Sequence, residues 1–121
     1  MKFICLGYYN KAAMEPFSRA EVDAIMRDCG PFIDDLYRTG RVMVDVGLEN
    51  PATTVRTVQG KPQVTDGPFV ETKEVLGGIT IIEAADLNEA IQIASRHPAV
   101  RMGERYGWHQ EIRALHTFKQ F

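Results

Sequence analysis

The sequence has few cysteines, and neither lies in a pattern that binds metal or forms a redox motif. Its two cysteines, Cys5 and Cys29, belong to no CxxC pair and no Cys/His cluster, so we expect both to be reduced packing residues. No run of about 18 apolar residues occurs, and the apolar run within MKFICLGYYN is too short for a signal peptide or a membrane span. We therefore expect a cytoplasmic protein with no membrane partner.

The chain also lacks an excess of charge of either sign. Its 14 Lys and Arg residues nearly balance 16 Asp and Glu residues, for a formal net charge of -2. Proteins that bind a phosphate backbone usually show a concentrated basic excess, so we expect no direct contact with nucleic acid. A phosphate-binding loop, a GxGxxG motif, a catalytic triad signature and a metal-ligand spacing of the three histidines are missing too. The sequence therefore implies no cofactor and no metal.

What is present suits one globular domain over residues 1–121, since 45% of the residues are hydrophobic and the length supports one core. Alternating apolar residues predict strands over residues 2–8, 41–48, 78–84 and 110–115, and a hairpin of residues 52–58 and 63–65. Helical spacing predicts two helices, one after a capping box of Ser18 and Glu21 and one near Asp86. Gly30-Pro31 should kink or break the first helix near its middle.

The predicted order is strand, helix, strand, an inserted hairpin, strand, helix and strand. Without the insertion this is the βαββαβ pattern of α+β ferredoxin-like folds, in which two helices cover one face of an antiparallel sheet. The first strand is apolar on both sides, with Phe3 and Cys5 on one and Ile4 and Leu6 on the other. Leaving one face in water would forgo burial worth roughly 25 cal/mol per Å². We therefore expect a homodimer in which two sheets pack face to face.

The segment VTDGPFVETKE, residues 64–74, is a charged connection longer than a plain hairpin needs. One interpretation is a turn in which Asp66 bonds nearby backbone N–H groups. The other is a polar pocket in which Asp66 is the acid or base and Lys73, flanked by acids, tunes it or holds an anion. Glu74 belongs to the same set of candidate binding residues.

A second set of candidates lies in RMGERYGWHQEIR, residues 101–113. Arg101 and Arg113 are candidates to orient a carboxylate or phenolate of a ligand. Period-two alternation places Glu111 and Arg113 on the strand face away from the helices, where they either form an interface ion-pair network or line a wet cleft.

Two other polar residues have open interpretations. In residues 41–48 the alternation predicts Val42, Val44 and Val46 on one side and Asp45 on the other. Asp45 is either an edge residue in solvent or a residue that borders the cleft. His97 precedes a proline and is interpreted as a helix-ending residue whose positive charge favours the helix dipole.

The stretch TDGPFVETKEVLGG, with IIEAADLNEAIQIASRHP after it and EIRAL near the end, resembles the DGPF (DGPFAETKE) branch of bacterial YCII-related proteins. The resemblance covers most of the chain and implies a small protein of the dimeric α/β-barrel type. It also implies a gene neighbourhood with extracytoplasmic-function sigma factors, which makes a sigma factor a candidate partner. In the wider group some members are enzymes acting on small aromatic compounds, and a His–Asp pair is proposed as catalytic. Residues 18–39 contain no histidine, so the resemblance assigns no such pair here.

Three functions follow for the segment of residues 64–74. It belongs to an enzyme that binds a small polar or aromatic molecule in a cleft associated with the dimer, with Asp66 as acid or base. Alternatively, the same pocket serves a non-catalytic ligand sensor or a regulator of a transcription factor. In the third interpretation the segment is a latch that holds the dimer together.

Overall fold

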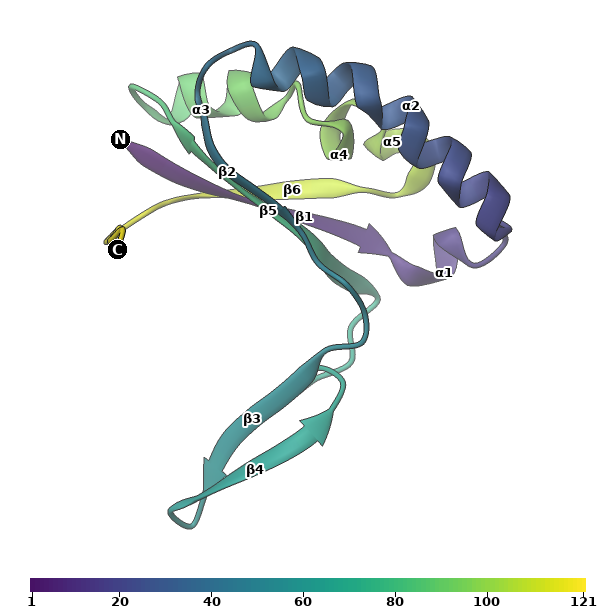
Figure 1. Cartoon of the computed structure of the whole chain (residues 1–121), viewed down its shortest axis with the longest axis vertical. Coiled ribbons are helices and arrows are strands. Elements are labelled where there is room, and N and C mark those ends of the chain that lie inside the picture. The colour runs from purple at the N-terminus through teal and green to yellow at the C-terminus, as the bar shows by residue number, and fades with distance from the viewer.

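A computed structural model describes all 121 residues and contains a four-stranded antiparallel sheet with its helices on one face (Figure 1). The strands of this sheet are β1 (Lys2–Asn10), β2 (Val42–Gly47), β5 (Glu74–Glu83) and β6 (His109–Ala114). They lie in the order β2-β5-β1-β6. This order is consistent with a ferredoxin-like fold, so the predicted α+β class is confirmed.

The long helix α2 (Arg19–Tyr37) begins at the predicted capping box. The Ser18 hydroxyl accepts a hydrogen bond from the Glu21 N–H at 3.2 Å, and the Glu21 carboxylate accepts one from the Ser18 N–H at 3.0 Å. The predicted break at Pro31 is wrong, because α2 continues through that residue. Buried Ile25 and Leu36 lie on either side of Pro31 and hold both halves of the helix against the rest of the molecule.

The remaining helices are short. They are α1 (Lys11–Met14), α3 (Leu87–Ala94), α4 (Pro98–Arg101) and α5 (Gly103–Tyr106). The last two lie within residues 98–106, for which the sequence patterns predict neither a helix nor a strand. None of the helices combines the length and the apolar character that crossing a membrane would require.

The register of the sheet sorts the helix-facing side chains into three rows, because antiparallel partners share a face. Each row crosses the four strands in the order β2, β5, β1, β6. The rows are Val42, Ile82, Phe3 and Ala114; then Asp45, Thr80, Cys5 and Ile112; then Gly47, Gly78, Gly7 and Gln110. The core gathers on the first row, where Phe3 and Ile82 pack with Leu36 of α2 and Ala90 of α3.

The opposite side, which we call the open face, carries no helix (Figure 1). Its aliphatic residues are Ile4, Leu6, Val44, Val46, Ile79 and Ile81. The predicted pattern for β2 is partly wrong. A register shift between Val42 and Val44 turns Val42 toward the core, while the next two valines point to the open face.

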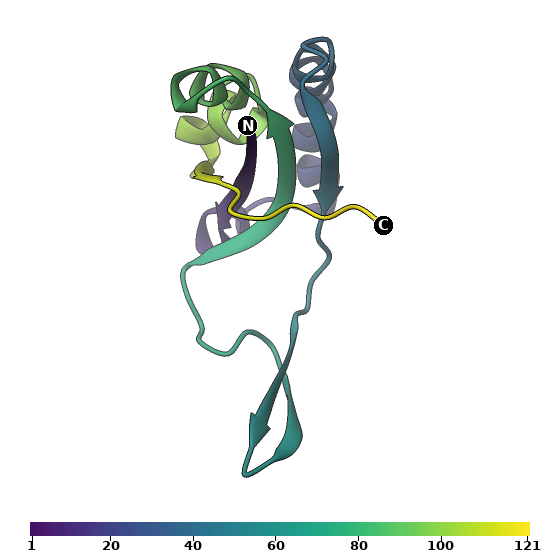
Figure 2. The same cartoon turned by 90° about the vertical axis from the view of Figure 1, so that its left-hand side faces the viewer.

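Between β2 and β5 the chain forms a separate two-stranded sheet of β3 (Thr53–Val58) and β4 (Lys61–Asp66), which we call the arm. Its turn consists of Gln59 and Gly60, both with positive φ, 51° and 75°, as a tight hairpin turn requires. The arm projects from the sheet on the side away from the helices (Figures 1 and 2). Because β5 begins at Glu74, the connection after the arm spans only residues 67–73.

Candidate functional site

A pocket of about 580 Å³ lies between α2 and the third row of the sheet. It forms there because Gly47, Gly78 and Gly7 lie side by side on three strands and leave the space beside the sheet without side chains. A Cβ built on Gly47 would have no atom within 4 Å. The opposite wall is apolar and comes from α2, through Val22, Met26, Cys29 and Ile33.

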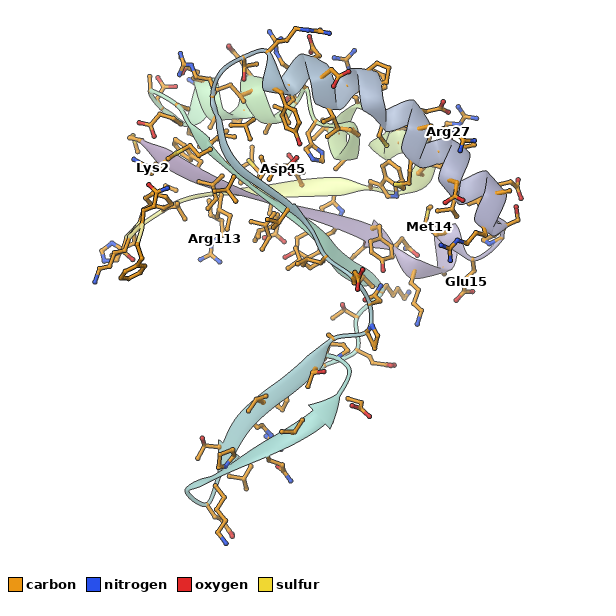
Figure 3. All side chains as sticks on the ribbon, in the orientation of Figure 1. Lys2, Met14, Glu15, Arg27, Asp45 and Arg113 are labelled. Atoms are coloured by element: carbon orange, nitrogen blue, oxygen red, sulfur yellow. The ribbon has the colours of Figure 1, made fainter.

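Asp45 borders this pocket from the second row, on the helix side of the sheet (Figure 3). Its Oδ1 accepts a hydrogen bond from the Thr80 hydroxyl at 3.1 Å, and its Oδ2 accepts one from the Tyr37 hydroxyl. Thr80 is only 3% exposed, so the hydrogen bond between Thr80 and Asp45 lies at the boundary between the buried core and the pocket. The hydrogen bond to Asp45, with burial and the nearby acidic charges, raises the pKa of Tyr37 to about 12. Tyr37 therefore stays protonated and holds the carboxylate in place.

His97 lines the same pocket from the N-cap position of α4. Its Nδ1 accepts a hydrogen bond from the Ala99 N–H at 2.9 Å. Because a backbone amide can only donate, Nδ1 holds a lone pair, and the proton of the neutral ring is on Nε2. Burial lowers the pKa of His97 below its ordinary value, and the negative charge of Asp45 opposes part of that effect. At pH 7 the imidazole is thus a neutral hydrogen-bond donor at the pocket wall.

An aromatic side chain and an amide complete the polar end of the pocket. Trp108 lies 5.0 Å from the ring of Tyr106, centroid to centroid, and both it and Gln110 line the pocket. The Gln110 Oε1 atom is buried and accepts no hydrogen bond. A buried acceptor without a partner is costly, so this amide is suited to bond a ligand.

The two cysteines are free thiols, as the sequence predicted. Burial raises the pKa of Cys5 to about 11. It also raises the pKa of Cys29, with a further contribution from Asp28. Cys29, which lines the pocket, is therefore a protonated, weakly polar part of its wall.

The structure places Asp66 and Lys73 outside this pocket. Asp66 ends β4 in the arm and is exposed. Lys73 is exposed just before β5, and its backbone carbonyl accepts a hydrogen bond from the Lys11 N–H at 3.3 Å. Neither side chain lines the pocket of its own chain. Their predicted roles as acid or base and as anion holder stay predictions.

The other three predicted site residues lie in three different places. Glu74 begins β5, and its Oε2 is 4.0 Å from Nδ1 of His109. Arg101, on α4, places its guanidinium 4.8 Å from the ring centroid of Phe32. Arg113 is on the open face, on the far side of the sheet from Asp45 (Figure 3). Within one chain, the five candidates therefore do not form one site.

The residues that do meet in the pocket were not assigned to a site from the sequence. For Asp45 the sequence allows either an edge residue or a cleft residue, and β2 is indeed the edge strand. For His97 the sequence predicts the end of a helix, and this is wrong, because the residue is the N-cap of α4. The signal was the dipeptide His97-Pro98, since proline favours the first position of a helix and the preceding residue is then the N-cap.

Comparison with known proteins identifies relatives of this chain. An uncharacterized protein from Rhizobium meliloti (strain 1021) is 33% identical over 103 residues, which cover 78% of this chain and 77% of the relative. Among solved structures, 5-chloro-2-hydroxyhydroquinone dehydrochlorinase from Burkholderia phenoliruptrix AC1100, in complex with 2,5-dihydroxybenzoquinone, matches with a TM-score of 0.49 and 13% identity. That match covers 95% of this chain and 93% of the other. The family model of the YCII-related domain matches residues 1–106. The chain therefore belongs to the YCII-related domain family.

Proposed function

We propose that this protein binds a small, mostly apolar molecule in the pocket between α2 and the sheet and catalyses the transfer of a proton from that molecule. The observation that supports this is the presence of a carboxylate and a neutral imidazole donor, from Asp45 and His97, on the walls of one apolar pocket. Its volume of about 580 Å³ falls within the roughly 300–1,000 Å³ of small-molecule sites. Apolar walls with few polar groups are also typical of such sites.

The two polar groups suit a ligand that carries a carbonyl or phenolic oxygen. The Nε2–H of His97 donates to that oxygen, and Asp45 accepts a proton from the neighbouring carbon or hydroxyl. The electron pair left by the proton moves onto the oxygen, where the donor from His97 stabilises the developing negative charge. A neutral imidazole can do this without giving up its proton. The reaction class is therefore enolisation or a related proton shift.

A second candidate function is binding without turnover. Both carboxylate oxygens of Asp45 already accept hydrogen bonds from protein hydroxyls, those of Thr80 and Tyr37. A carboxylate held in this way can serve as a fixed acceptor that selects a ligand. A ligand sensor needs only such selective binding, without a chemical step. The binding of a ligand in the pocket is common to both functions.

The protein further acts, in this proposal, as a homodimer of the dimeric α/β-barrel type, joined through the open face. Val44 and Val46 are 37% and 41% exposed there, beside Ile79 and Ile81. Contiguous aliphatic surface of this kind mostly marks an interface. Arg113 and Glu111 share the face, so their charges require partners across the interface or water at its rim.

The binding step is tested by filling the pocket from Gly47. Gly47→Leu places a side chain into free space, since nothing lies within 4 Å of its Cβ, and Gly47→Ala is the matched control. The probes are small phenols, cyclic ketones and quinones, titrated while the fluorescence of Trp108, the single tryptophan, is recorded. We expect saturable changes in the wild type and the alanine variant, and none in the leucine variant. Equal titration curves for all three proteins would refute binding at this pocket.

The chemical step is tested with any ketone that binds. We expect loss of the proton NMR signal next to its carbonyl in D2O, and a loss of at least about tenfold in that exchange rate in Asp45→Asn. Binding without catalysed exchange would support the sensor instead.

A further inference from the structure

We propose that the arm of each chain clasps a second copy of this chain and covers the mouth of that copy's pocket. The inference rests on the homodimer proposed above, but it needs neither a particular ligand nor proton transfer. It makes each pocket a site completed by the partner.

The arm lacks support within its own chain. β3 and β4 pair only with each other, and every residue of these two strands except Thr54 is exposed. Val55 and Val64 face each other across the ladder and are 63% and 65% exposed. An isolated two-stranded hairpin is marginally stable in water, so this arm requires a surface to pack against.

A second copy is the partner that the chain itself supplies. The arm continues directly from β2 and leads back into β5, and these strands carry Val46 and Ile79 of the open face. In one chain the arm extends beyond the ends of β2 and β5, on the side away from the helices (Figure 1). When two open faces meet, each arm would therefore run alongside the other copy. In a dimer with twofold symmetry, the open face and the arm of each chain are then both covered by the other chain, and the assembly is closed.

Charge indicates where on the second copy the arm lies. The arm carries two basic residues, Arg56 and Lys61, and one acidic residue, Asp66, at the end of β4. The helix α2 carries five acidic and two basic residues, and four of the five acidic side chains are exposed. Within one chain the arm points away from α2 (Figure 1), so these opposite charges can meet only between chains. Because α2 is also a wall of the pocket, we place the arm along the edge of α2 that borders the pocket, where it would cover the mouth.

The dimensions of the two elements match. Strands of six residues span about 20 Å. The 19 residues of α2 extend about 28 Å. The hairpin is therefore long enough to cover most of the helix.

Trp108 provides a test that requires no ligand. The reporter chain has residues 53–66 replaced by a short Gly-Ser linker and keeps Trp108. The donor chain carries Trp108→Phe and a complete arm, so it does not fluoresce as a tryptophan. We expect acrylamide to quench the reporter alone about twice as strongly as the wild type, and an excess of donor chain to restore the wild-type quenching. A reporter that responds to no amount of donor, or that is quenched like the wild type from the start, overturns the proposal.

A second pair of variants keeps the test decisive if the shortened chain does not fold. Val55→Asp with Val64→Asp changes two side chains that water already reaches in the single chain. We expect unchanged circular dichroism and at least a tenfold weaker dimer in sedimentation equilibrium. The matched control is Gln59→Asp at the tip of the arm, which should leave the dimer intact. A monomeric wild type, or a dimer that the aspartates do not weaken, would contradict the clasp, even if the pocket still binds its ligand.

Discussion

The contact between Thr80 and Asp45 can be measured as a coupling free energy. Thr80→Val removes the hydroxyl but keeps the shape of the buried side chain, and Asp45→Ala removes the acceptor. Hydrogen bonds to charged groups contribute about 1.5–3 kcal/mol. Because water can reach the Asp45 carboxylate from the pocket and replace part of this bond, we expect the low end. The two changes together should cost about 1.5 kcal/mol less than the sum of the single changes.

The assay is urea unfolding of the wild type, the two single variants and the double variant, followed by circular dichroism. A matched control pairs Asp45→Ala with Thr54→Val, since the Thr54 hydroxyl also donates a 2.7 Å hydrogen bond, but to the carbonyl of Gly67 in a distant part of the chain. That pair should be additive within about 0.5 kcal/mol. If the Thr80 pair is equally additive, Asp45 does not contact Thr80 and the assignment of its side chain to the pocket is refuted.

Three further predictions concern the pocket and its support. Between the lowered pKa of His97 and its ordinary value of 6.5, the unfolded chain binds more protons than the folded chain, so the free energy of unfolding should fall as the pH drops through that window. His97→Gln should flatten this pH dependence in urea titrations. An unchanged pH dependence in that variant would contradict the lowered pKa. Leu36→Ala, at a side chain only 1% exposed, should lower the free energy of unfolding by about 2–5 kcal/mol, and a loss below about 1 kcal/mol would mean that the site is not in the core. Ser18→Ala should cost about 1 kcal/mol through the lost cap, with no change in ligand titrations of Trp108.

The fold was largely readable because its signals are local. The capping box at Ser18 and the alternation of Phe3 and Ile4 each depend on a few neighbouring residues. Two of the errors also came from local signals, which tertiary packing overrides. Pro31 does not break α2 because the helix packs on both sides of it, and Val42 turns inward because of an irregularity in β2.

The site was harder to predict because it depends on residues that only the register brings together. Gly7, Gly47 and Gly78 lie far apart in the sequence, yet they form one row across three strands. No local pattern predicts that row of glycines. Without the row, the sequence cannot indicate that a pocket lies beside Asp45 and His97. The segment around Asp66 drew attention through its length and charge, which are typical of a functional loop but equally of an interface.

The proposed function requires His97 to present a neutral Nε2–H donor to the pocket that Asp45 borders. The most direct measurement is a long-range ¹H–¹⁵N correlation spectrum of the histidine rings at neutral pH, assigned with the His97→Gln variant. We expect the His97 ring to be neutral with its proton on Nε2, and to stay neutral below the pH at which an ordinary histidine titrates. A proton on Nδ1, or a ring charged at neutral pH, would refute this role of His97.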